Sequence, residues 1–472
     1  MLNDYRYSYL VLLLLLIIIK STSSIHYIED VDSLRFALSV NNGFDLLSLQ
    51  PHFPGYPVFC FFAKYLYLII GNTGIVFSFI GAISTFILIY FTNLFLKIKI
   101  NSIEGLFVAC IICFNPMIWI MGNRYMPDLM GLSLFFASFF YLVQNDFKQN
   151  ILGSFLGGLL LGVRLSYFPL ILFPIFILLK RVEGFKKKIL LVFLSLGILV
   201  WLAPMILVTG WNNFLHVVSS QTLGHFNDYG GTIITESNWI ERIIFFIQTI
   251  WSDGLGGYWP DRSWTTLPLS LALLYLIVPA FRLIKSRLKN QKFIKIFIIS
   301  IIAYSSWVLL FQNVIYKSRH VLPIVFGILF IIIIYLQHLY KDRLFFKNII
   351  IGFFIFNLIY LSLNLSFQHK QGVAVFNASE YLNKFEQPIN IVSTPLINFY
   401  FQSVGVQGDY YSVDDTHDLD LLRNNLQSGI KNIVVGDFQS IFTDDTQFVL
   451  DTSFYHNPYM NRMWAAINIY SD

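Results

Sequence analysis

The sequence predicts an α-helical polytopic membrane protein that carries a small α/β domain in its C-terminal part. Of its 472 residues, 56% are hydrophobic and only 12% are charged, whereas soluble domains contain about 25% charged residues. Long apolar runs recur up to about residue 368, and the sequence after them is polar and acidic. We therefore divide the chain into a membrane domain at 1–368 and a soluble domain at 369–472.

The apolar runs indicate about eleven transmembrane helices, because a hydrocarbon core about 30 Å thick needs roughly 20 residues per helix. The first run, Tyr7–Ile19, is not followed by a small-residue cleavage site, so we interpret it as a span and not as a signal peptide. Ile151–Lys180 predicts two shorter helices that meet near Arg164 and Pro169. The other runs lie at 74–96, 104–122, 127–144, 189–208, 264–281, 296–312, 321–339 and 348–367.

Lysine and arginine gather in every second connection between these runs, for example after 74–96, after 151–180 and after 264–281. By the positive-inside rule, these connections and the N-terminus face the cytoplasm. The long segments 24–73 and 209–263 then lie on the outer face, together with the C-terminal domain. Two apolar stretches within them, Tyr56–Gly71 and Trp239–Trp251, contain charged residues and predict helices that lie along the membrane surface.

The C-terminal part alternates short strand-like and helix-like patterns. From Lys370 onward it contains twelve acidic residues against five lysines or arginines. Ile389–Ser393 and Asn432–Gly436 are β-branched runs that suit buried strands. Asp418–Leu426 fits an amphipathic helix that ends before Ser428-Gly429. This alternation predicts a small extracytoplasmic α/β domain.

An acidic cluster follows the first apolar run and is the strongest candidate for chemistry. It contains Glu29, Asp30 and Asp32. The spacing of the next apolar residues predicts a helix that begins at Ser33, with Asp32 as its N-cap. A carboxylate at a helix N-terminus stays ionised, as a general base must be. Glu29 is expected to face solvent.

Other polar residues of the predicted outer face could complete a site. The turn QPHFPGYP at 50–57 contributes His52, which can titrate near neutral pH, and Tyr56. Each candidate also has a structural interpretation, such as a turn strut, a helix cap or a contact with lipid headgroups. The remaining candidates for substrate binding are Arg124, Asp128, Arg164, Lys317, Arg319 and His320.

Lys317, Arg319 and His320 break the distribution of basic residues, because they lie at the predicted outer end of a span. They either extend to headgroups or form an anion site for a lipid phosphate, which arginine can grip through two hydrogen bonds. His225 and Asp228 are a weak candidate for a divalent metal site, with only their spacing of three residues to support it. No cofactor is otherwise indicated.

These motifs resemble the GT-C superfamily, and within it the protein O-mannosyltransferase and aminoarabinose-transferase group of bacterial membrane glycosyltransferases. The resemblance rests on the early acidic outer loop, the HFPGYP turn and the alternating long outer loops, and it covers the chain to about residue 340. It implies an outer-loop Asp as catalytic base and a sugar donor carried on polyprenyl phosphate. By the pattern D-S-x-x-F-A, Asp32 in DSLRFA matches best, and Asp30 is the second choice.

The resulting hypothesis is an inverting glycosyltransferase in a bacterial inner membrane, with a glycan, lipid or protein hydroxyl as acceptor and no nucleic-acid partner. Its expected partners are the membrane lipids that surround it and a sugar donor carried on polyprenyl phosphate. A polysaccharide polymerase, ligase or flippase that handles lipid-linked glycans is the main alternative. A secondary transporter is disfavoured, because its polar residues and broken helices would lie at the membrane midplane. Here the polar residues gather on one face.

Overall fold

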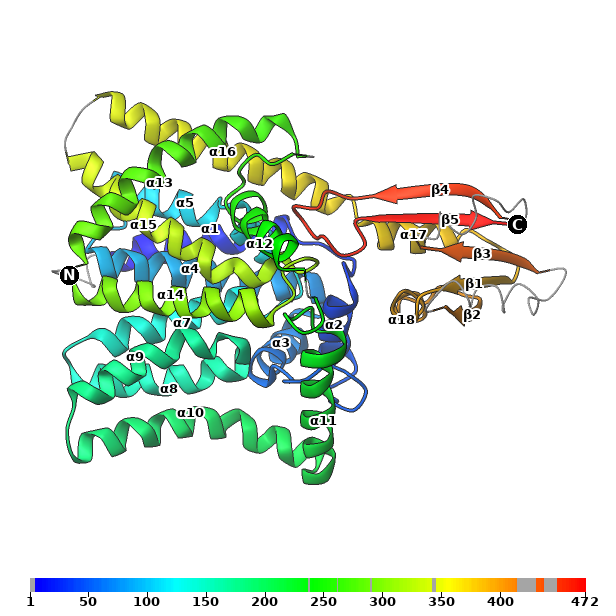
Figure 1. Ribbon diagram of the computed structural model, residues 1–472, viewed down its shortest axis with the longest axis horizontal. Coiled ribbons are helices and arrows are strands. Elements are labelled where there is room, and N and C mark those ends of the chain that lie inside the picture. Colours follow the sequence, from blue (N-terminus) through cyan, green and yellow to red (C-terminus); the bar gives the residue numbers. More distant parts are fainter. Residues whose placement is uncertain are drawn as a thin grey trace.

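The computed structural model describes residues 5–236, 238–260, 262–288, 291–341, 345–413, 430–436 and 448–472. It consists of a bundle of long helices and a module built around a β-sheet, which sits at one end of the bundle (Figure 1). The N-terminus lies at the opposite end of the bundle from this module (Figure 1). The boundary predicted between residues 368 and 369 stays a prediction.

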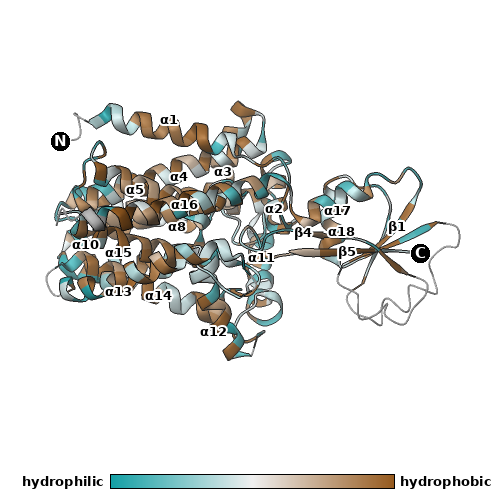
Figure 2. Cartoon of the chain, turned by 90° about the horizontal axis from the view of Figure 1, so that it is seen from above, coloured by the Kyte–Doolittle hydropathy of each residue, from teal (hydrophilic) through white to brown (hydrophobic). Residues whose placement is uncertain are grey.

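Helices form at each predicted apolar run. Within the described residues, six of them (α4, α10, α13, α14, α15 and α16) are long and apolar enough to cross a membrane. Figure 2 shows hydrophobic residues along the bundle helices and hydrophilic residues at the bundle's ends. The chain is thus an integral membrane protein, while the number of eleven spans stays a prediction. The bundle contains α1 (Arg6–Thr22), α4 (Thr73–Leu96), α5 (Ile103–Cys113), α6 (Pro116–Met121), α7 (Asp128–Val143), α8 (Phe147–Val163), α9 (Phe168–Arg181), α10 (Phe185–Thr209), α13 (Leu267–Arg287), α14 (Lys292–Phe311), α15 (Leu322–Lys341) and α16 (Phe345–Lys370).

The run 104–122 forms two helices and not the one continuous helix that its apolar length predicts. α5 ends at Cys113, and α6 starts anew at Pro116. Asn115 is the N-cap of α6, where its side chain accepts a hydrogen bond from the Ile118 amide at 3.1 Å. Proline lacks an N–H and suits the first turn of a helix but not its interior. The Asn-Pro pair therefore divides an otherwise continuous apolar run.

The break predicted within 151–180 is confirmed. α8 ends at Val163, and α9 begins at Phe168 after a 3₁₀ turn at Leu165–Tyr167. Arg164 stands between them in an extended conformation, with φ of −151°. The break places the Arg164 side chain off the helix axis, at the end of the bundle where the sheet module lies.

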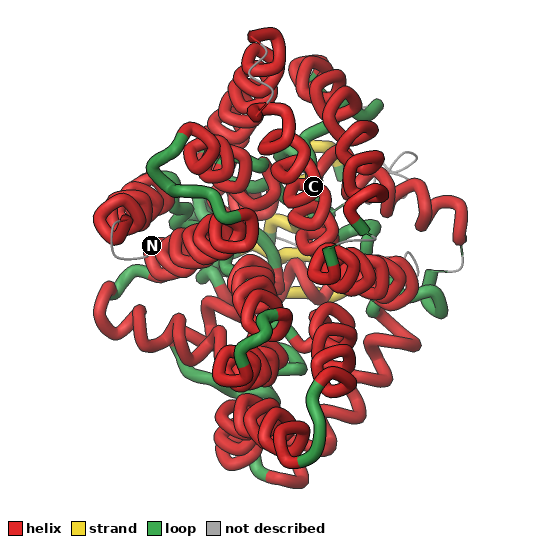
Figure 3. Tube along the Cα trace, turned by 90° about the vertical axis from the view of Figure 1, so that its left-hand side faces the viewer, coloured by secondary structure: helices red, strands yellow, loops and turns green. Residues whose placement is uncertain are grey.

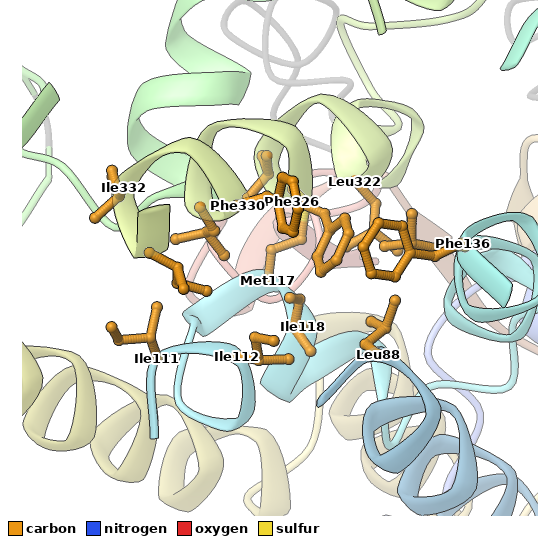
Figure 4. Close-up of a cluster of buried hydrophobic side chains, with 14 of the residues drawn as sticks. Leu88, Ile111, Ile112, Met117, Ile118, Phe136, Leu322, Phe326, Phe330 and Ile332 are labelled. Carbon is orange, nitrogen blue, oxygen red and sulfur yellow. The ribbon is translucent and has the colours of Figure 1, made fainter. Parts of the chain in front are cut away.

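Small and aromatic residues determine how the bundle helices pack. α8 and α10 approach closely through Gly158 and Gly197, since a Cβ on Gly158 would come within 2.3 Å of the Leu194 carbonyl oxygen. Such small-residue contacts are a common mode of helix packing in membranes. Elsewhere α15 packs its Phe326 and Phe330 against Met117 of α6 and Phe136 of α7 (Figure 4).

Shorter helices cover the end of the bundle beside the sheet module. α11 runs crosswise to the long helices (Figure 1). The helices predicted at the membrane surface are present, as α3 and α12. One face of α12 exposes Ile240, Ile244 and Ile247, while its Arg242 is buried and donates to the backbone oxygens of Gly231 and Gln312. These covering helices are α2 (Val31–Asn41), α3 (Pro57–Ile70), α11 (Trp211–Gly224) and α12 (Trp239–Gln248).

The C-terminal module contains a five-stranded sheet, in the order β2-β1-β3-β5-β4 among the described residues. β1 pairs with β2 and β3 in parallel, and β5 pairs antiparallel with β3 and β4. The two predicted strands are confirmed as β1 and β3, whereas the helix predicted at 418–426 lies outside the described residues. The module contains α17 (Ala374–Leu382), β1 (Ile389–Ser393), α18 (Pro395–Ser403), β2 (Asp409–Ser412), β3 (Lys431–Val435), β4 (Val449–Tyr455) and β5 (Ala466–Ser471).

The module and the bundle share one hydrophobic core. The cluster that contains Leu34 and Phe36 of α2 also contains Ile391 of β1 and Phe401 of α18. The Tyr400 hydroxyl donates to the Ile28 carbonyl at 2.6 Å and anchors α18 beside α2. Viewed from the opposite end of the bundle, the sheet lies behind the helices (Figure 3). The module is therefore seated on the end that carries the acidic segment.

Candidate active site

Asp32 lies in the first turn of α2 and is buried, with 2% of its surface exposed. Its Oδ2 accepts from Lys317 Nζ at 2.6 Å and from Arg319 at 2.5 Å. Arg35 and the His52 ring lie 3.8 Å and 4.0 Å from its Oδ1. Burial alone would raise the pKa of the Asp32 carboxyl, but the charges of Lys317 and Arg319 hold that pKa well below its usual range. Asp32 is therefore ionised and tightly paired.

Asp30, and not Asp32, is the N-cap of α2. The helix starts at Val31, and Asp30 Oδ1 accepts from the Ser33 amide at 2.7 Å. The prediction of Asp32 as N-cap of a helix beginning at Ser33 is wrong, because the helix begins two residues earlier and Asp30 takes the capping role. The other oxygen of Asp30 accepts from Arg124 at 2.7 Å and from Asn461 at 3.0 Å. Asp30 is thus fully engaged in structural contacts.

Glu29 is buried, so the expectation that it faces solvent is wrong. Its carboxylate accepts from Arg124 at 2.8 Å and lies 2.8 Å from His369 Nε2. Burial raises the pKa of Glu29, but Arg124 and His369 outweigh burial and lower that pKa to about 2. Arg124 therefore joins Glu29 to Asp30 and stabilises the segment that leads into α2.

Asp128 forms a second acidic centre in the first turn of α7. Its Oδ1 lies 3.1 Å from Arg164, and its Oδ2 lies 3.8 Å from Arg319. Within the described residues, neither oxygen receives a well-directed hydrogen bond, although the side chain is completely buried. Arg319 thus lies between the carboxylates of Asp32 and Asp128. Arg164 also donates to His320 Nδ1 at 3.1 Å and to the Tyr56 hydroxyl at 3.3 Å.

The HFPGYP turn supplies His52 and Tyr56 to the same site. The turn needs glycine at Gly55, whose φ is +84° and where a Cβ would come within 3.0 Å of Leu46 and Met205. The His52 ring and the Tyr56 hydroxyl lie 3.2 Å apart. Burial lowers the pKa of His52 to about 3, against the attraction of Asp32, so its imidazole is neutral at physiological pH.

The cluster has more positive than negative charge. Four cationic side chains, those of Arg35, Arg164, Lys317 and Arg319, surround the two carboxylates of Asp32 and Asp128, which leaves two positive charges in excess. We define these six residues, with His52, Tyr56 and His320, as the polar cluster. A buried excess of positive charge attracts an anion, and the paired carboxylates offer proton acceptors beside it.

Sequence reasoning identified every residue of the polar cluster except Arg35. Arg35 was missed, although its position three residues after Asp32 on a helix places both on one face. Arg124 lies with Glu29 and Asp30 and makes no direct contact with Asp32. Among the described residues His225 makes no hydrogen bond with the polar cluster, and its Nε2 lies 3.0 Å from the Phe311 carbonyl oxygen. Among the described residues there is no group of three histidines, cysteines or acids that could hold a metal ion, so His225 and Asp228 find no third ligand.

A connection of the C-terminal module completes the surroundings of the acidic segment. Residues 456–465 link β4 to β5 and reach the end of the bundle, and we call them the β4–β5 connection. Besides the bond from Asn461 to Asp30, the Met460 carbonyl accepts from Arg124 at 3.3 Å. Arg462 pairs with buried Asp253 at 2.6 Å and donates to the Ile315 carbonyl at 3.3 Å. No signal in the sequence indicated this long-range contact.

The fold of this chain is found in solved structures, whereas its sequence matches no family model and no curated protein. It is similar to a crystal structure of ArnT from Cupriavidus metallidurans bound to undecaprenyl phosphate, with a TM-score of 0.57 and 9% sequence identity. That alignment covers 99% of this chain and 98% of the other. The apo structure of the same protein aligns with a TM-score of 0.54, 9% identity and 98% coverage of both chains. The chain therefore has the fold of the ArnT structures, over nearly its whole length.

Proposed function

We propose that the chain is a membrane glycosyltransferase that moves a sugar from a polyprenyl-phosphate donor to an acceptor hydroxyl at the outer membrane surface. The observation that carries the proposal is the buried Asp32 carboxylate held between Lys317 and Arg319, in a cluster with excess positive charge. The fold supports the same reaction class, since its neighbour ArnT binds undecaprenyl phosphate. The basic residues at the far end of the bundle support an outward-facing site.

The cations of the polar cluster suit the phosphate of such a donor. Arg319 and Arg35 offer planar guanidinium groups, which can each give two hydrogen bonds to a phosphate, and Lys317 adds a point charge. Lys317 retains 29% of its side-chain surface exposed, so it lies nearest to an arriving ligand. Charge that develops on the departing phosphate would be stabilised by groups already in place.

In the proposed reaction the acceptor oxygen attacks the anomeric carbon of the sugar. The new bond forms between these two atoms, while the bond from the anomeric carbon to the phosphate oxygen breaks and its electron pair leaves with the polyprenyl phosphate. The proton of the acceptor hydroxyl passes to Asp32, the general base. One displacement on the face opposite the phosphate inverts the configuration at the anomeric carbon.

Donor binding would also activate the base. Without donor, Lys317 and Arg319 hold the pKa of Asp32 well below its usual range, which makes the carboxylate a weak proton acceptor. A donor phosphate competes for the same two cations. As they turn to the phosphate, the pKa of Asp32 rises towards that of an ordinary carboxyl, and the carboxylate becomes a stronger base when the sugar is in place.

The test is transfer by the purified protein in liposomes that contain a radiolabelled polyprenyl-phosphate hexose or pentose. We expect labelled product and release of polyprenyl phosphate, with inversion seen by NMR of the product. Arg319→Gln should weaken binding of undecaprenyl phosphate about 10- to 100-fold, the range for a hydrogen bond to a charged group. Lys384→Gln, a change at an exposed lysine of the C-terminal module, is the control. Failure of every donor, together with unchanged lipid binding in Arg319→Gln, would refute the proposal.

A further inference from the structure

A cavity of about 610 Å³ opens at the end of the bundle opposite the polar cluster. The two sites lie at opposite ends of α7. Asp128 of the polar cluster begins this helix, and Leu142 and Val143 at its other end line the cavity. At 1.5 Å per residue, α7 separates them by roughly 24 Å. The cavity is therefore separate from the proposed transfer site.

The rim of the cavity is basic. Lys97, Arg181, Arg287 and Lys292 line it, together with the amide side chains of Asn145, Gln291 and Gln337, and none of the lining residues that the structure describes is acidic. Arg181 donates to the Gln144 carbonyl and to Asn150, and so ties α9 to the start of α8. The side chains of Arg287 and Lys292 make no hydrogen bond or ion pair with another described residue. Four positive charges around one opening favour an anionic ligand.

The walls below this rim are apolar. Phe95 and Leu96 of α4, Pro174 and Ile177 of α9, and Phe293 and Ile296 of α14 face the cavity. A small soluble anion would bind at the rim only, and the apolar side chains of the walls would stay in contact with water. An amphiphile, with a charged head and hydrocarbon chains, satisfies both the rim and the walls.

We propose that this cavity binds an anionic phospholipid from the leaflet on the basic side of the membrane. The phosphate would lie between Arg287 and Lys292 at the rim, and the start of the acyl chains would lie against Phe293 and Ile296. Basic pockets between transmembrane helices on the cytoplasmic side are suited to anionic lipid headgroups. The bound lipid would join the ends of α4, α9, α13 and α14. This inference does not depend on the proposed sugar transfer.

The experiment measures binding of phosphatidylglycerol and of phosphatidylcholine to the purified full chain by native mass spectrometry. We expect phosphatidylglycerol to be preferred, and Arg287→Gln/Lys292→Gln to weaken it about 30-fold, since each basic residue near an anionic surface contributes roughly fivefold. The matched control is Lys187→Gln/Lys188→Gln, which removes the same charge from exposed positions of α10 outside the cavity. The control should bind within about twofold of the wild type.

A second variant distinguishes binding inside the cavity from general attraction of the lipid to basic residues. Val143→Trp should fill the cavity and weaken phosphatidylglycerol binding while all four basic residues remain. Size-exclusion and thermal-unfolding profiles like those of the wild type establish that each variant is folded. The proposal is overturned if phosphatidylcholine binds equally, if the control loses as much affinity as the cavity variant, or if undecaprenyl phosphate displaces phosphatidylglycerol from the cavity at equal concentration.

Discussion

Replacing Asp32 with asparagine isolates the proposed base, because the side chain keeps its shape and loses its charge and its affinity for a proton. Removing a general base typically slows catalysis about 10²- to 10⁴-fold, so we expect kcat for sugar transfer to fall by that range. The affinity for the donor lipid should not fall with kcat. Without a competing carboxylate, Lys317 and Arg319 are free for the phosphate, and the affinity for undecaprenyl phosphate should stay equal or increase.

The cost in stability should be moderate. Truncating one partner of a buried ion pair commonly costs about 3–5 kcal/mol. Here Arg319 keeps Asp128 at 3.8 Å and Lys317 keeps contact with solvent, so the loss should approach that of a single charged hydrogen bond, about 1–3 kcal/mol. Thermal unfolding in detergent measures this loss, and the variant should remain folded at the assay temperature.

The assay determines kcat from transfer at saturating donor and the dissociation constant from undecaprenyl phosphate binding, in the same preparation. Transfer within tenfold of the wild type would show that Asp32 is not the base. A parallel loss of transfer and of lipid binding would show instead that Asp32 is a structural strut for the polar cluster. Only a fall in kcat with retained binding agrees with the proposed mechanism.

Three further predictions follow from the contacts around the polar cluster. Asp30→Asn should reduce kcat far less than Asp32→Asn does, because asparagine is an equally good N-cap, while the weakened Arg124 pair lowers thermal stability; an equal loss of transfer would contradict this assignment. Arg462→Met leaves Asp253 paired with Arg262 alone and should cost about 1–3 kcal/mol of unfolding free energy, as for the loss of one charged hydrogen bond, measured by thermal unfolding. Because burial lowers the pKa of His52 to about 3, below its unfolded value near 6.5, its neutral form stabilises the fold above pH 6.5 and this contribution is lost as pH falls towards 3. His52→Asn should therefore flatten the pH dependence of the unfolding midpoint in this window, and an unchanged slope would argue against the buried neutral ring.

The helices of the bundle follow from the sequence because the bilayer dictates their length and composition. The same constraint made Lys317, Arg319 and His320 conspicuous, since they interrupt a regular distribution of basic residues. Arg164 stood out for a similar reason, as a charge in an apolar run. The cost of polar side chains in a membrane therefore identified four of the nine residues of the polar cluster.

The pairing of the acids could not be predicted in the same way. Glu29 looked exposed because its partners Arg124 and His369 lie 95 and 340 positions away along the chain. Asp30 and Asp32 both satisfy the local rule for an N-cap. The tertiary structure distinguishes them, because it brings Arg124 to Asp30, the structural acid. It brings Lys317 and Arg319 to Asp32, the candidate base.

The β4–β5 connection has a consequence for how the protein is made. Asn461 reaches Asp30 across 431 positions of sequence, so ribosomes must synthesise nearly the whole chain before the acidic segment gains its last partner. Until then, Asp253 lacks Arg462, and the segment around Ile315 lacks a tether. The end of the bundle that carries the acidic segment therefore gains its last contacts late in biosynthesis. A chain interrupted before residue 456 would lack the contacts of this connection with Asp30 and Asp253.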